Sequence, residues 1–166
     1  MPKRINEVVP PAKLGTLTQA SRSPHALVAI YGLSVSVLLF VACLALPAYT
    51  VEGPEKPDVV HSLWELVIGW LGVFYGIQEW LANPLLVIAW GLMLTRRYKA
   101  ATIVALAAAL ISASFLLRDT VVISEAPTYG RVVAYHGGYW LWLGSAAAAC
   151  AASAMAMRRS SHGAGA

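Results

Sequence analysis

Charged residues and apolar segments alternate along this chain, and this alternation restricts its fold more than any other feature. Nine of the twelve Lys and Arg residues lie in three places: the first 24 residues, residues 96–99 and residues 158–159. Seven of the eight acidic residues lie in two other stretches, residues 52–79 and 119–125. Apolar segments separate the basic from the acidic stretches. This order is typical of a multi-pass membrane protein whose orientation follows the positive-inside rule.

The composition agrees with a chain that lies mostly in a bilayer. Hydrophobic residues make up 58% of the 166 residues and charged residues only 12%, whereas soluble domains average about 25% charged residues. The apolar residues also form runs long enough for a membrane helix, which needs roughly 20 residues. The net charge of +4 fits basic residues at the cytoplasmic ends of helices, so we expect lipid as a partner and no nucleic acid.

The apolar runs predict an all-α membrane protein with four transmembrane helices in one domain. The helices are expected at residues 26–46, 78–95, 100–117 and 139–157, in a transmembrane domain that covers residues 25–158. Residues 1–24 and 159–166 are expected to be cytoplasmic tails. Because the basic clusters then share one side, both termini are predicted to lie in the cytoplasm, and the protein in the inner (cytoplasmic) membrane.

The apolar stretch at residues 64–95 is too long for one helix and short for two. Two spans would also place the basic residues 96–99 outside the cell, against the charge rule. We therefore expect residues 64–75 to form an interfacial or re-entrant helix on the outer side, followed by the second span. Pro84 falls inside that span and is expected to kink it. Three glycines at spacings of three and four, Gly69, Gly72 and Gly76, predict a smooth face for helix contact.

A small β-hairpin is predicted outside the membrane between the third and fourth spans. Residues 120–124 and 131–135 are rich in β-branched and aromatic side chains. Pro-Thr-Tyr-Gly at 127–130 is typical of a turn. A strand near residues 49–52 is expected to join this hairpin.

Three segments resemble a recurring pattern in small bacterial multi-pass membrane proteins that have no established activity. They are Leu-Ala-Leu-Pro-Ala at 44–48, Gly-Trp-Leu-Gly at 69–72, and Trp-Leu-Ala-Asn-Pro-Leu-Leu at 80–86. The Trp-x-Ala-Asn-Pro element is the most specific of them, and the pattern covers about the first 95 residues. The resemblance implies a bacterial inner-membrane protein and brings no cofactor or site residue.

The first candidate site consists of Glu79, Trp80 and Asn83. Glu79 and Asn83 are one helical turn apart, so they project from one face near the outer interface. Polar groups at an interrupted helix can line a path for an ion or a substrate. The alternative is that the carboxylate lies at headgroup level and the amide braces the kink.

The second candidate site is an outer pocket that contains His61, Glu65, Arg131 and His136. His61 and Glu65 are four residues apart and would share a helix face. With His136 they could supply three metal ligands. Exposed loop histidines are commoner, so no metal and no cofactor is predicted. Arg131 is expected to take part in ion pairs that hold the hairpin, together with Arg118, Asp119 and Glu125. The alternative is that these residues form a binding surface for a partner or an anionic ligand.

These features allow three functions. The first is a non-catalytic accessory or oligomer-forming subunit, working as a homo-oligomer or with a membrane protein partner; it rests on the Ala- and Gly-rich helix faces. The second is a small oligomeric channel or carrier that uses Glu79, Asn83 and the broken second helix. The third is a membrane enzyme or ligand-binding protein with an extracytoplasmic site. No nucleophile or phosphate-binding motif is recognisable, so no catalytic residue is predicted.

Overall fold

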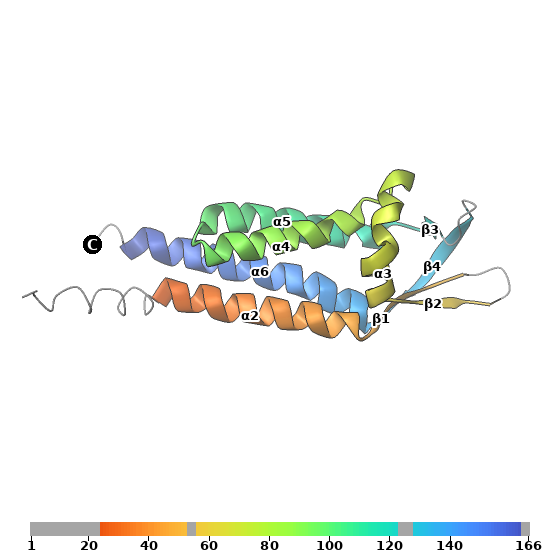
Figure 1. Cartoon of the computed structure of the whole chain (residues 1–166), viewed down its shortest axis with the longest axis horizontal. Coiled ribbons are helices and arrows are strands. Elements are labelled where there is room, and N and C mark those ends of the chain that lie inside the picture. Colours follow the sequence, from red (N-terminus) through yellow and green to blue (C-terminus); the bar gives the residue numbers. More distant parts are fainter. Residues whose placement is uncertain (1–23, 53–55, 123–127, 164–166) are drawn as a thin grey trace, which may run out of the picture.

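The long helices of the described residues form an elongated bundle with a small β-sheet at one end (Figure 1). This computed structural model describes residues 24–52, 56–122 and 128–163. The long helices are α2 (Pro24–Leu44), α4 (Ala82–Leu94), α5 (Tyr98–Ser114) and α6 (Gly137–Gly163). Helix α2 begins and α6 ends at the end of the bundle opposite the sheet. We call the two ends of the bundle the sheet end and the terminal end.

Within the described residues, three helical segments are long and apolar enough to cross a membrane. They are Ala26–Leu44, Tyr98–Leu117 and Gly137–Ser160, where the second includes a 3-10 turn, η5 (Phe115–Leu117). The fourth long helix, α4, follows another 3-10 turn, η4 (Glu79–Leu81), and the two together are shorter. A helix suits an apolar environment because its backbone groups bond to one another within the segment.

Small residues bring the helices close together. Alanines on α5 and α6 are between 0% and 2% exposed: Ala101, Ala105, Ala108, Ala149, Ala152 and Ala156. Helix α6 packs against both α2 and α5, and α5 also packs against α4. The small residues therefore allow tight packing among these helices. Two hydrogen bonds add to it, since Ser36 Oγ donates to the Ser145 carbonyl (2.7 Å) and accepts from Trp90 Nε1 (2.9 Å).

The sheet has four antiparallel strands in the order β2-β1-β4-β3. They are β1 (Pro47–Val51), β2 (Asp58–His61), β3 (Thr120–Val122) and β4 (Tyr129–Tyr135). The hairpin of β3 and β4 and its pairing with a strand near residue 49 were predicted from the sequence. Strand β2 was not predicted, so the sheet has one strand more than expected. Part of the predicted turn, with Glu125, lies outside the described residues.

The segment between β2 and η4 crosses the sheet end of the bundle (Figure 1). It contains α3 (Ser62–Ile68) and a 3-10 helix, η3 (Gly69–Tyr75). An extra helical piece was predicted here, beginning two residues later. Its glycines do not form a helix-packing face: Gly69 lies against Glu65 and Trp80, and Gly76 ends η3 with a φ of 78°. That left-handed conformation favours glycine.

Pro84 does not kink a continuous helix, contrary to the prediction. The α-helix begins at Ala82, so Pro84 lies in its first turn, where a missing N–H breaks no intrahelical bond. The chain changes from 3-10 to α geometry at residues 81–82 instead. The α-helical part of this predicted span is therefore shorter than expected.

Helix α6 continues to Gly163, beyond the predicted start of the C-terminal tail at residue 159. Arg158 and Arg159 lie in its final turns, where positive charge is favourable next to the helix dipole. Ser160 Oγ also donates to the Met157 carbonyl (2.7 Å). The predicted N-terminal tail, apart from Pro24, and residues 164–166 lie outside the described residues.

Candidate functional site

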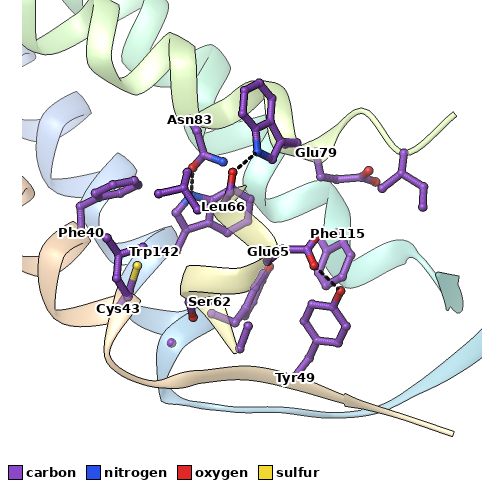
Figure 2. Close-up of a pocket in the computed structure, with 16 residues that line it drawn as sticks. Phe40, Cys43, Tyr49, Ser62, Glu65, Leu66, Glu79, Asn83, Phe115 and Trp142 are labelled. Atoms are coloured by element: carbon purple, nitrogen blue, oxygen red, sulfur yellow. Dashed lines mark hydrogen bonds between the residues drawn. The ribbon is translucent and has the colours of Figure 1, made fainter. Parts of the chain in front are cut away.

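A cavity of about 70 Å³ lies where the helix bundle meets the sheet. Its wall is mostly apolar and aromatic, and it includes all three residues of the first candidate site and one of the second (Figure 2). The lining residues come from α2, β1, α3, the η3–α4 segment, η5 and α6: Phe40, Cys43, Leu44, Ala48, Tyr49, Ser62, Glu65, Leu66, Ile77, Glu79, Trp80, Asn83, Phe115, Gly138, Tyr139 and Trp142.

The Trp-x-Ala-Asn-Pro element supplies two polar contacts beside the cavity. Trp80 Nε1 donates to the Leu66 carbonyl of α3 (3.0 Å), and Trp142 Nε1 of α6 donates to Asn83 Oδ1 (2.8 Å; Figure 2). Asn83 therefore bonds to a distant helix through its side-chain carbonyl, whereas one of the two interpretations of the sequence had its amide brace the local kink. These two bonds fix the start of α4 against both α3 and α6.

Glu79 is buried and ion-paired. Its residue is 7% exposed, and its Oε1 accepts from Arg118 Nε at 2.8 Å. Arg118 Nη2 also donates to the Gly76 carbonyl (3.0 Å). The sequence predicted that Arg118 would pair within the hairpin, but it pairs with the carboxylate before α4. The pair thus joins the entry of one long helix to the exit of the next.

Glu65 extends from α3 towards Tyr49 of β1 (Figure 2). The Tyr49 hydroxyl donates to Glu65 Oε2 at 3.0 Å. Burial raises the pKa of the Glu65 carboxyl above its ordinary value of 4.5, while the bond from Tyr49 acts in the opposite direction. Burial, followed by the proximity of Glu65, raises the pKa of the Tyr49 hydroxyl. Tyr49 therefore stays a donor, and Glu65 is a carboxylate whose charged form is disfavoured.

Two lining atoms are buried without a hydrogen-bond partner among the described residues: Glu79 Oε2 and Ser62 Oγ. Ser62 is 8% exposed and packs directly against Gly138 at the start of α6. An unsatisfied buried polar atom costs about 1–3 kcal/mol. Both atoms belong to residues that line the cavity, and both are covered by surrounding protein atoms.

The other residues of the predicted outer pocket do not line the cavity. His61 is exposed at the end of β2, and Arg131 is exposed on β4. A hydrogen bond joins His136 Nε2 to Thr50 Oγ1 (2.7 Å). His61 ends β2 and His136 follows β4, and these two strands lie on opposite sides of β1. Among the described residues, the two histidines therefore form no three-ligand group with Glu65.

The two predicted sites therefore contribute to one cavity, through Glu65 on one side and Glu79, Trp80 and Asn83 on the other. Comparison of the chain with protein-family models, curated proteins and solved structures gives no match. A few polar groups in a mostly apolar and aromatic wall are typical of a pocket for a small molecule.

Sequence reasoning missed the partners from distant segments. Tyr49, Ser62, Phe115 and Trp142 all line the cavity but carry no motif. One signal did exist for Trp142: Asn83 is a polar side chain in an apolar run and needs a donor, and an indole N–H is a donor. Several tryptophans satisfy that condition, and the sequence does not distinguish among them.

Proposed function

We propose that the chain is a multi-pass protein of the bacterial inner membrane with four spanning segments and both termini in the cytoplasm. The charge distribution supports this. Among the described residues, the terminal end carries five Lys and Arg and no acid, namely Arg96, Arg97, Lys99, Arg158 and Arg159. The sheet end carries five acids and three bases: Glu52, Lys56, Asp58, Glu65, Glu79, Arg118, Asp119 and Arg131. The positive-inside rule then assigns the sheet end to the outside.

The fourth spanning segment is η4 with α4. Large apolar side chains on its outer face are exposed, with Val87, Ile88 and Leu94 at 55%, 52% and 67%. Soluble proteins seldom expose such a continuous surface, whereas lipid covers it in a bilayer. The segment is about 26 Å long at the usual rises of about 1.5 and 2.0 Å per residue. That length is close to the hydrocarbon thickness of roughly 30 Å, and local thinning accommodates the difference.

Segment α3–η3 lies in the outer interface. It runs across the bundle end (Figure 1), and Trp64, Trp70 and Phe74 are exposed on it. Tryptophan rings are enriched at the boundary between headgroups and acyl chains. An interfacial position for this segment also places the cavity beneath it at headgroup depth.

The orientation predicts which sites are open to reagents from outside. In a background that lacks Cys43 and Cys150, Ala134→Cys on β4 should react with a membrane-impermeant maleimide on spheroplasts. Lys99→Cys, at the terminal end, should react only after permeabilisation. Labelling of Lys99→Cys in intact spheroplasts would contradict the orientation.

We propose that the protein binds a small molecule in the cavity without transforming it. The observation that carries this proposal is a cavity of about 70 Å³ with a mostly apolar and aromatic wall, in which two residues, Glu79 and Ser62, each hold a buried polar atom without a partner among the described residues. Asn83, Trp80 and Arg118 are held in structural contacts. They therefore support a preorganised binding site more than an acid–base centre.

Assembly and ion transport stay predictions. The small-residue faces that favour an oligomer pack between α2, α5 and α6 of the same chain. Glu79 and Asn83, the residues that favour a path for an ion or a substrate, are already paired with Arg118 and Trp142. Binding is therefore the function that the geometry supports best.

Filling the cavity tests this function. Ala48 lines it and is 7% exposed, so Ala48→Leu should occupy part of the space that a ligand needs. We expect native mass spectrometry of the purified wild-type protein to retain a bound molecule that Ala48→Leu has lost. Ala134→Leu, an exposed position on β4, should keep it. A wild-type protein without any bound molecule, or equal retention by both variants, would contradict the proposal, and the same spectra give the oligomeric mass.

A further inference from the structure

We propose that the molecule bound in this cavity presents an ammonium group. The inference rests on the proposed binding function and specifies its ligand class. Two sources share this chemistry: a free small amine, and the headgroup of an amine-bearing phospholipid.

The first argument is charge. Glu79 is neutralised by Arg118, whereas the partner of Glu65 within the described residues is a neutral hydroxyl, that of Tyr49. A buried carboxylate without a cation is costly. The cavity wall thus has one negative charge in excess when Glu65 is ionised. A cationic ligand would compensate that charge, whereas an anionic ligand would add to it.

The second argument is the acceptor chemistry of the wall. An ammonium group carries three donors and accepts no hydrogen bond. The wall includes the Glu65 carboxyl group, and two of its other residues each carry a buried polar atom without a partner among the described residues, Glu79 Oε2 and Ser62 Oγ. A ligand with an ammonium group can donate to the Glu65 carboxylate, whereas a carboxylate or phosphate ligand cannot.

The third argument is the aromatic wall. Tyr49, Trp80, Phe115 and Trp142 line the same space, and the rings of Tyr49 and Phe115 are 5.1 Å apart. Aromatic faces attract cations, most strongly once the cation is desolvated. Gly69 keeps this arrangement open, because a Cβ there would lie 2.8 Å from both Glu65 Oε1 and Trp80 Cδ1. The glycine therefore lets the carboxylate and an indole ring lie side by side.

The fourth argument is size and depth. A cavity of about 70 Å³ holds a small headgroup but not a whole lipid, since about 10–15 Å³ of such volume accommodates one water molecule. In the proposed orientation the cavity lies at the level of the outer headgroups. Both a dissolved amine and a lipid headgroup can reach it there.

Ethanolamine and propan-1-ol form a matched pair of probes, because a methyl group replaces the ammonium group and the rest is unchanged. We expect ligand-observed NMR on the detergent-purified protein to show ethanolamine binding about tenfold more tightly than propan-1-ol. Glu65→Gln should weaken ethanolamine binding about tenfold. Glu52→Gln, which removes an exposed charge at the end of β1, should leave it unchanged. Ala48→Leu should block both probes by volume, so the result does not depend on one variant.

The lipid source is tested separately with nanodiscs that contain equal amounts of phosphatidylethanolamine and phosphatidylglycerol. Preferential retention of phosphatidylethanolamine in native mass spectra, lost in Glu65→Gln, would assign the ligand to the lipid. Ethanolamine binding without this retention would assign it to a free amine, and both results support the inference. Equal affinity for the two alcohols would overturn the ammonium assignment but keep the binding function. No binding of either probe and no retained lipid would overturn both.

Discussion

Replacing Arg118 with alanine is expected to destabilise the fold by about 2–3 kcal/mol, the largest effect of any single polar substitution at this site. The reason is the carboxylate that it leaves behind. Glu79 would be buried with both oxygens unpaired, since Oε2 already lacks a partner among the described residues. Breaking a buried ion pair usually costs about 3–5 kcal/mol. We expect less here because the Arg118 side chain is 29% exposed and water can partly solvate the site.

Two further variants distinguish the loss of the buried ion pair from a general loss of stability. Arg131→Ala removes an exposed arginine on β4 and should change stability by less than about 0.5 kcal/mol. Arg118→Ala combined with Glu79→Gln should recover much of the loss, because the amide carries no charge to bury. The free energy of unfolding is measured by titrating detergent micelles with SDS and following circular dichroism. Equal losses for Arg118→Ala and Arg131→Ala would show that the pair is not buried in solution.

The long helices were predictable because hydropathy and charge act over whole segments. A backbone in lipid must satisfy its own hydrogen bonds, so an apolar run such as residues 100–117 has few alternatives to a helix. The ends were less predictable. Helix α6 runs six residues past the expected Met157, and α4 begins only at Ala82. Local contacts determine where these helices begin and end, and a hydropathy pattern carries no information about those contacts.

The sheet was only partly predictable, for a related reason. Residues 120–124 and 129–135 carry the β-branched pattern of strands, whereas β2 has only Val59 and Val60 between Asp58 and His61. Its strand conformation comes from pairing with β1, where Thr50 opposes Val59 and Val51 opposes Asp58. Such a strand depends on its partner more than on its own propensity.

The cavity shows the same limit at the level of single side chains. Glu79 and Asn83 were recognisable as polar groups in an apolar stretch. Their partners, Arg118 and Trp142, lie 39 and 59 residues further along the chain. Nothing in local spacing selects these partners, because the packing of α4 against α5 and α6 brings them into reach. The sequence therefore identified Glu79 and Asn83, whereas only the fold identified the residues that bond to them.

Replacing Gly32 with alanine is expected to destabilise the bundle by about 1–3 kcal/mol, the usual cost of overpacking a close contact. A Cβ at Gly32 of α2 would overlap the Cβ of Ala152 and lie 3.4 Å from its Cα on α6. Helices α2 and α6, which share the most extensive contact between any two described elements, would have to move apart. Separation would also lengthen the hydrogen bond from Ser36 Oγ to the Ser145 carbonyl, which is 2.7 Å long and lies one turn away.

Gly91→Ala is the matched control, because no atom lies within 4 Å of a Cβ built at this exposed position of α4. It should stabilise the protein slightly, by about 0.5–1 kcal/mol, since alanine is the better helix former. Gly32→Ala with Ala152→Gly returns the missing space and should restore most of the stability in the same SDS titration. If Gly32→Ala lowers the free energy of unfolding, Gly91→Ala raises it, and Ala152→Gly rescues the first variant, then Gly32 is needed for the close contact between the α2 and α6 backbones. Equal effects at both positions would mean that α2 and α6 are further apart in the folded protein, and that helix propensity alone determines the outcome.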